Sequence, residues 1–303
     1  MRRAIRLKEW GIGIDVQRTP DAGAIERSDP TLGADTVRFR TDADGFIASG
    51  FAHAPGDDDI IVLGDSVVEC MFLHEGRRLS DRCELALRRR GIAARVRNGG
   101  ASGTTSLHLL NMILAKIVPL RPRALVILNG VIDIDVSLKS GGFWSRDAYL
   151  NPLKCEPEPP PGAVEPLVAM DLSDRTRMLE LIGETCDRFG LPLAFATFAH
   201  RGRDDYAIAR GAWFEELSAK RRAVNANTRS YCAAAGRTCI DLENEFAGRA
   251  DLFYDQFHLN HEGARVIGEA LAERLAGLFF ASVPGRLNPR DGSAPASPAA
   301  IRS

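Results

Sequence analysis

The chain has 303 residues, of which 45% are hydrophobic and 26% are charged. This composition is typical of a globular protein with one large α/β domain or two small ones, and it excludes disorder or a coiled coil as the main state. The 39 Lys and Arg against 40 Asp and Glu give a net charge of −1. No long-range field therefore draws the chain onto nucleic acid or an anionic membrane, so we expect a small or neutral partner.

The cysteines and the first residues bear on the cellular compartment. The six cysteines contain no Cys-x-x-Cys pair, so we expect free thiols in the core and a reducing compartment. The first twenty residues hold no apolar run long enough for a signal peptide, and no stretch reaches the length of a membrane span. For the chain as given, we expect a cytoplasmic protein.

Residues 1–57 are expected to form an extension of the main domain. The stretch VRFRTDADGFIASG carries Asp44-Gly45 between alternating runs, which predicts a hairpin appended to the main sheet.

From residue 58 to 282, short apolar runs alternate with amphipathic stretches. This rhythm predicts an α/β domain built around a parallel sheet. The predicted strands are 59–64, 94–98, 124–129, 192–198 and 238–242. The predicted helices are Leu79–Arg90, Thr105–Ile117, Leu172–Phe189, Trp213–Ala235 and Glu262–Phe280.

Two segments depart from that rhythm. Residues 137–171 contain Trp144, Tyr149 and the run KCEPEPPPG, which is too rich in proline for regular structure. An insertion after the third strand is well placed to cover a site, with Trp144 contacting substrate. The tail 283–303 is rich in Pro, Ala and Ser and is expected to be flexible.

Polar and glycine residues follow three of the predicted strands. Gly64-Asp65-Ser66 comes after the first, Asn98-Gly99-Gly100-Ala101-Ser102-Gly103 after the second, and Asp255-Gln256-Phe257-His258 after the fifth. Taken alone, the first motif is also explained by a helix cap, the second by a tight turn and the third by a surface ion pair. Together they lie at one edge of a parallel sheet and provide a nucleophile, backbone donors and a base with its orienting carboxylate.

Other polar residues near this edge have simpler readings. His200 follows the fourth strand and is a candidate for substrate contact or for a plain loop position. Glu69 is expected to favour the helix N-terminus after Ser66, and His261 to cap a helix or face solvent. A zinc site from His200, Asp255, His258 and His261 matches no known ligand spacing, so we expect no metal.

The ordered motifs IVLGDS, NGGASG and DQFHLNHEG resemble those of the SGNH or GDSL hydrolases over about residues 58–280. The resemblance implies a flavodoxin-like three-layer α/β/α sandwich whose five-stranded parallel sheet has the order 2-1-3-4-5. It also implies Ser66 as nucleophile, His258 as base, Asp255 as its orienter, and the N–H groups of Ser66 and Gly100 as oxyanion-hole donors. No cofactor is implied.

One motif departs from the family pattern. The third block of the family is Gly-x-Asn-Asp, whereas this chain has Gly130-Val131-Ile132-Asp133. Ile132 donates no hydrogen bond, and the loss of one such donor costs roughly 100- to 1,000-fold in turnover. If the loop runs as in the family, Ile132 lines the substrate site beside the oxyanion; if the loop is shifted, Asn129 is an alternative donor.

The sequence therefore predicts a serine ester hydrolase that acts through an acyl-enzyme on a small-molecule or glycan ester, such as an acetylated carbohydrate or a short-chain lipid. Two alternatives stay open: an O-acyltransferase with the same Ser-His-Asp site, and a catalytically weak binding protein on the same fold. The acyl group, the alcohol and the oligomeric state do not follow from the sequence.

Overall fold

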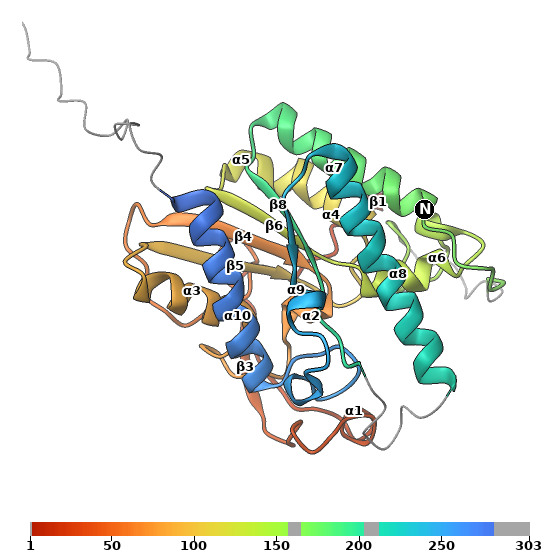
Figure 1. The fold of residues 1–303 in the computed structure, drawn as a ribbon, viewed down its shortest axis with the longest axis horizontal. Helices are drawn as coiled ribbons and strands as arrows, with labels where there is room; N and C mark the ends of the chain where they lie inside the picture. Colours follow the sequence, from red (N-terminus) through yellow and green to blue (C-terminus); the bar gives the residue numbers. More distant parts are fainter. Residues whose placement is uncertain (1, 157–164, 203–211, 282–303) are drawn as a thin grey trace, which may run out of the picture.

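The computed structural model describes residues 2–156, 165–202 and 212–281. Its centre is a five-stranded parallel sheet with the order β5-β4-β6-β8-β9, which is 2-1-3-4-5 in chain order (Figure 1). The predicted strands and their order are confirmed. The strands are β4 (Asp58–Gly64), β5 (Ala94–Gly100), β6 (Ala124–Leu128), β8 (Leu193–Thr197) and β9 (Cys239–Asp241). The predicted flexible tail, 283–303, lies outside the described residues.

Both faces of this sheet are buried, which explains why its strands read as continuous apolar runs. Side chains alternate along β4, so Ile60 and Val62 join one apolar cluster and Ile61 and Leu63 join another. Helices α3 and α10 cover the first face, and α4, α7 and α8 cover the second (Figure 1). Their bounds are α3 (Leu79–Arg89), α4 (Ser106–Met112), α7 (Ser173–Phe189), α8 (Ala212–Ala235) and α10 (His261–Leu275).

Short elements complete these layers. Helix α4 continues through a π-helical turn, η1 (Ile113–Ile117), into α5 (Val118–Leu120), and α10 continues into the π-helical turn η4 (Ala276–Phe280). The carboxyl edge of the sheet carries α2 (Ser66–Glu69), α6 (Val131–Ser137), α9 (Leu242–Glu245) and the 3-10 turn η3 (Ala250–Leu252). Within the described ranges, no helix is long and apolar enough to cross a membrane.

The N-terminal extension attaches to the edge of the sheet beside β5. The chain reverses at Asp44-Gly45, with Gly45 at φ +79°. Ile47 forms antiparallel bridges with both Thr41 and Asn98, the second of which lies in β5. The sequence did not predict that β3 (Val37–Arg40) pairs with β2 (Asp15–Arg18), nor the short helix α1 (Ala22–Glu26). Strand β2 reads DVQR and is almost fully exposed, so it carries no apolar alternation.

The prediction that the run KCEPEPPPG within residues 137–171 lacks regular structure was wrong for its first residues, which belong to a strand. The segment holds a 3-10 turn, η2 (Gly142–Trp144), and strand β7 (Leu153–Glu156). Strand β7 pairs antiparallel with β1 (Arg2–Ile5), so the first residues of the chain hold the insertion in place. Both strands are largely exposed, which hid them from a search for buried runs. Residues 157–164, with most of the proline run, lie outside the described part.

A buried ion pair joins the helices that flank the end of β6. Asp133 of α6 accepts from the N–H of Ser106 at 2.9 Å and from Arg175 Nε at 3.1 Å. Arg175 of α7 also donates to Asn227 and Thr228 of α8, at 2.6 and 2.9 Å. Asp133 therefore holds helices in place and is not available to a substrate.

Replacing Arg175 with methionine is expected to lower the free energy of unfolding by about 3–5 kcal/mol, because the Asp133 carboxylate stays buried without its partner. Urea denaturation of the purified protein measures the change. Arg177→Met, on the exposed face of the same helix, is the matched control and should cost less than about 1 kcal/mol. Equal losses in the two variants would contradict this reading of the ion pair.

Candidate active site

Ser66 begins helix α2 at the carboxyl end of β4. Asp65 caps this helix: one of its carboxylate oxygens accepts from the N–H of Val67 at 3.0 Å and the other from the N–H of Val131 at 3.2 Å. Burial raises the pKa of Asp65 to about 6. Because Asp65 makes the cap and also ties down the loop after β6, the hydroxyl of Ser66 is left for another partner.

That partner is His258, which the loop after η3 brings from 192 residues away. His258 Nε2 lies 2.8 Å from Ser66 Oγ, and His258 Nδ1 lies 2.7 Å from Asp255 Oδ2. The other oxygen of Asp255 accepts from the N–H groups of Phe257 and His258, at 3.0 and 2.8 Å. The structure therefore brings the three predicted residues into one hydrogen-bonded chain.

Packing and charge fix the imidazole of His258. Its ring stacks on Tyr254 at 5.5 Å between centroids and touches Phe257 at 4.3 Å. Burial alone would lower the pKa of His258, but the charge and hydrogen bond of Asp255, with the nearby Asp65 and Glu69, raise it above its ordinary value. Burial likewise opposes ionisation of Asp255, yet His258 and the two backbone donors hold the pKa of that carboxyl below its usual range. The ionised Asp255 thus favours the tautomer that leaves Nε2 free to accept the Ser66 proton.

The structure does not support Gly100 as an oxyanion-hole donor. Gly100 is the last residue of β5, and its N–H already donates to Asn98 Oδ1 at 2.9 Å. A Cβ there would lie 2.2 Å from the backbone nitrogen of Glu69, so glycine is needed at this position for close packing against α2. Gly103, three residues on, has φ +79°. Among the described residues, nothing accepts the N–H of Ser66 or of Gly103.

The structure gives Asn129 a different role from the predicted one. Asn129 is buried, and its amide group points to Ser106 Oγ and Asp133 Oδ2 at 3.5 and 3.4 Å. Its donor is therefore aimed into the helix-joining network around Asp133. Ile132 is half-buried and packs against an apolar cluster that includes Phe143 and Leu150 of the insertion.

The other two candidates for substrate contact are His200 and Trp144. His200 is buried, with Nε2 2.9 Å from Glu243 Oε1 and Nδ1 3.1 Å from the carbonyl of Arg201. Both ring nitrogens are thus engaged within the fold. The side chain of Trp144 is 56% exposed at the surface of the insertion. The aromatic residue of the insertion that does lie at the glycine-rich loop is Tyr149, because a Cβ at Gly103 would be 2.5 Å from its ring.

Glu69 has a role that sequence reasoning missed. It is buried at the end of α2 and accepts from the N–H and the hydroxyl of Ser102, and from Trp10 Nε1 at 2.8 Å. No local pattern signals this arrangement, since the three residues come from separate segments. Glu69 therefore ties the glycine-rich loop to the helix that carries Ser66.

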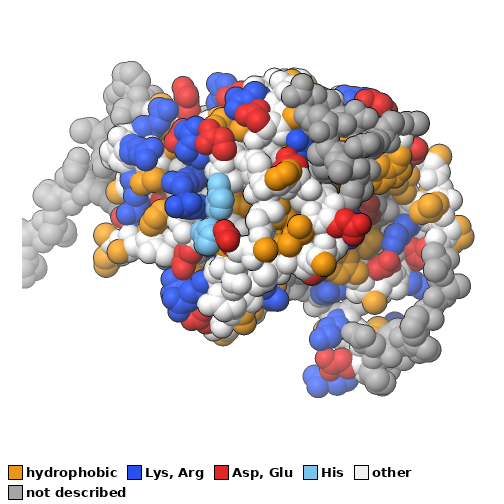
Figure 2. Space-filling model, turned by 90° about the horizontal axis from the view of Figure 1, so that it is seen from below, with side chains coloured by type: hydrophobic (Ala, Val, Ile, Leu, Met, Phe, Trp, Pro, Cys, Tyr) orange, Lys and Arg blue, Asp and Glu red, His pale blue; other side chains and the backbone are white. Residues whose placement is uncertain are grey.

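His261 is half-buried at the start of α10. Its ring stacks on His74 at 5.5 Å, and burial, His74, Arg77 and Arg82 together lower its pKa. Figure 2, a view from below Figure 1, shows exposed histidine side chains beside a group of Lys and Arg side chains. In the described ranges, no cluster of His, Cys, Asp or Glu is arranged to hold a metal ion.

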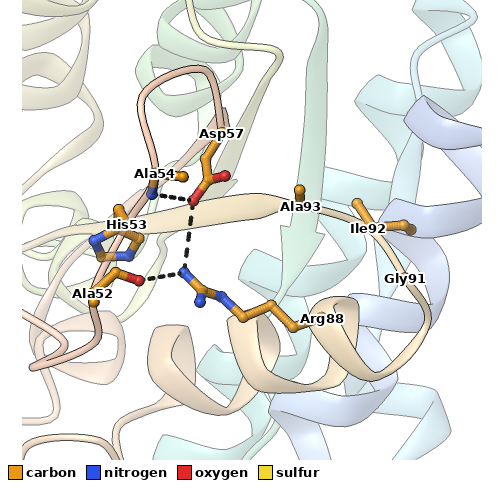
Figure 3. A pocket seen from close by; sticks show the side chains of 8 residues that line it. All are labelled: Ala52, His53, Ala54, Asp57, Arg88, Gly91, Ile92 and Ala93. Atoms are coloured by element: carbon orange, nitrogen blue, oxygen red, sulfur yellow. Dashed lines mark hydrogen bonds and ion pairs between the residues drawn. The ribbon is translucent and has the colours of Figure 1, made fainter.

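A pocket of about 590 Å³ lies at the opposite edge of the sheet, where β4 and β5 begin (Figure 3). Arg88 reaches across it to the carbonyl of Ala52 at 3.1 Å, and Asp57 accepts from the N–H of Ala54 at 3.0 Å. Its lining residues do not include the triad, so this hollow is separate from the candidate active site.

Comparison with known proteins supports the reading of the fold. The model of the GDSL-like lipase/acylhydrolase family matches residues 62–266, whereas no curated protein matches the sequence. Similar solved structures include an acetyl xylan esterase, AlAXEase, with 15% identity and a TM-score of 0.53, covering 72% of this chain and 99% of that one.

Two further structures share the fold. An acetylxylan esterase from Geobacillus stearothermophilus has 13% identity and a TM-score of 0.51, covering 74% of this chain and 96% of its own. A lipase/acylhydrolase from Enterococcus faecalis has 16% identity and a TM-score of 0.50, covering 73% and 96%. Since the family model spans more than half of the residues, the chain belongs to the GDSL-like lipase/acylhydrolase family.

Proposed function

We propose that this protein hydrolyses a small acyl ester through a covalent acyl-serine. The observation that carries the proposal is the chain from Ser66 Oγ through His258 to Asp255, with distances of 2.8 and 2.7 Å. Such a chain activates a serine hydroxyl, which is a weak nucleophile on its own.

In the proposed reaction, Ser66 Oγ attacks the carbonyl carbon of the ester while His258 Nε2 takes the hydroxyl proton. The resulting oxyanion accepts from the N–H groups of Ser66 and Gly103, and the positive end of α2 adds to the stabilisation. His258 then gives its proton to the departing alkoxide. A water molecule, deprotonated by His258, attacks the acyl-serine and releases the acid.

We propose a short acyl group, such as the acetyl group of a carbohydrate ester. The ring of Tyr149 lies directly against Gly103, and we propose that it forms a wall beside the oxyanion donors that limits the length of the acyl chain. Two proteins of the same fold are named as acetyl xylan esterases, and this activity is included in the test.

The test measures hydrolysis of p-nitrophenyl esters from acetyl to octanoyl and of acetylated xylo-oligosaccharides, with Ser66→Ala as the blank. Acetate release that depends on Ser66 and falls with acyl length is the expected result. An acyl group that appears on an added sugar instead of in water would favour the O-acyltransferase. Binding of the sugar without any turnover would favour a binding protein.

We expect kcat/KM for p-nitrophenyl acetate to rise with pH through an apparent pKa above 6.5, the ordinary value for histidine. Protonated His258 cannot accept the Ser66 proton, and the surrounding carboxylates raise its pKa, so activity is low in acid and reaches a plateau at higher pH. A pH–rate profile, corrected with the Ser66→Ala blank, measures this rise in kcat/KM. A midpoint below 6.5 would contradict the assignment of His258 as the base.

Replacing Ile132 with asparagine is expected to raise kcat on a good ester by up to roughly 100-fold, because it adds a side-chain donor where the family has one. The KM should change little, since the gain appears in the transition state. Ile132→Val is the control for lost packing against Phe143 and Leu150. If kcat is unchanged in Ile132→Asn, the position does not face the oxyanion, and the backbone donors act without it.

A further inference from the structure

Residues 6–10 lie beside the glycine-rich loop after β5, although they are more than ninety positions away from it in the chain. Trp10 reaches the loop through Glu69, and Lys8 reaches it through Tyr149 of the insertion. Three segments that are distant in sequence therefore meet next to Ser66.

The first connection converges on the buried carboxylate of Glu69. Trp10 Nε1 donates to Oε1 at 2.8 Å, the N–H of Ser102 donates to the same oxygen at 3.2 Å, and the Ser102 hydroxyl donates to Oε2. The Trp10 ring is itself held by Phe39, at 4.6 Å between centroids. A buried carboxylate is costly unless its oxygens accept hydrogen bonds, so the Trp10 and Ser102 donors together stabilise the charge of Glu69 in this place.

The second connection holds Gly103. Lys8 is buried; its Nζ donates to the carbonyl of Tyr149 at 2.7 Å and lies 3.7 Å from the centre of the Tyr149 ring. A Cβ at Gly103 would lie 2.8 Å from Lys8 Nζ and 2.5 Å from the ring. Arg6 adds hydrogen bonds to the carbonyls of Ala148 and Tyr149, at 2.7 and 3.1 Å. Lys8 and Tyr149 therefore form a wall that fixes where Gly103 lies.

We propose that Trp10 and Lys8 are positioning residues of the active site, which act through Glu69 and Tyr149 to hold Ser102 and Gly103 in the orientation needed for an oxyanion hole. This inference rests on the proposed ester hydrolysis and adds the N-terminal segment to its machinery. With Ile132 in place of a side-chain donor, the proposed donors are backbone N–H groups, whose direction depends on the loop alone. A displacement of about 1 Å at such a group costs on the order of 100-fold in rate.

The test is Trp10→Phe, which keeps an aromatic ring against Phe39 and removes the N–H donor to Glu69. We expect kcat on p-nitrophenyl acetate to fall about 10-fold while KM stays within about 2-fold, because the loop acts on the transition state. Trp213→Phe, an exposed tryptophan of α8, is the matched control and should leave both constants unchanged. Ser102→Ala, which removes the hydroxyl bond to Glu69 from the other side, should reproduce the loss in kcat even if the Trp10 variant folds poorly.

A double-mutant cycle distinguishes positioning through Glu69 from general loosening of the fold. In a Glu69→Gln background, Trp10→Phe should cost no more than about 2-fold further, because the route to the loop is already broken. Losses that multiply, or a rise in KM with kcat unchanged, would overturn the proposal. If the wild-type protein hydrolyses esters and neither Trp10→Phe nor Ser102→Ala changes kcat, this inference fails while the proposed function stands. A wild-type protein without Ser66-dependent activity would refute both.

Discussion

Replacing Ser66 with alanine is expected to lower kcat for ester hydrolysis by on the order of 10⁴- to 10⁶-fold, because no acyl-enzyme forms without the hydroxyl. Residual activity above the uncatalysed rate would come from the backbone donors and substrate binding alone. Substrate affinity should be retained, since Ser66 has a small side chain that only the reaction uses.

Steady-state assays with p-nitrophenyl acetate measure the loss, and circular dichroism checks that the fold is intact. Ser140→Ala, at an exposed position of the insertion, is the matched control and should keep full activity. A Ser66→Ala variant with more than about a tenth of the wild-type rate would show that another group is the nucleophile.

Replacing Asp255 with asparagine is expected to cost about 10⁴-fold in kcat, through the wrong tautomer of His258. One carboxylate oxygen accepts two backbone N–H groups in the native protein. The oxygen of an asparagine must take that place, which leaves its NH₂ group facing Nδ1. His258 Nδ1 then has to accept, the proton moves to Nε2, and the histidine can no longer take a proton from Ser66.

The same assays measure this variant, with Asp174→Asn, at a half-buried position in the first turn of α7, as the control for a carboxylate replaced by an amide. A pH profile adds a second readout: loss of the Asp255 charge removes the largest influence that raises the pKa of His258, so the activity limb should move to lower pH. A loss smaller than about tenfold, with the limb unmoved, would show that Asp255 does not orient the base.

The sequence predicted the parallel sheet because its strands are buried on both sides. Runs such as DIIVLG have no other stable place than the middle of a doubly covered sheet, and the alternating helices fix the connections. The proximity of Ser66, Asp255 and His258 was expected for the same reason, since loops after parallel strands share one edge.

The rest depends on contacts that leave no local pattern. Strands β1 and β7 are exposed and short, and each forms a strand because it pairs with the other. From the run NGGASG alone, Gly100 and Gly103 are equally plausible as oxyanion-hole donors. The folded chain distinguishes them, because the side chain of Asn98 accepts the Gly100 N–H. Glu69 is the clearest example, because its partners Trp10 and Ser102 come together only in the folded chain.

We propose that Ser66 is a nucleophile activated by His258 and Asp255. The sharpest test is reaction with a fluorophosphonate probe followed by peptide mass spectrometry. Only an activated serine attacks such a probe at a useful rate. We expect one labelled residue, Ser66, in the wild-type protein and no labelling in His258→Ala. Labelling at any other residue, or none in protein that hydrolyses esters, would contradict it.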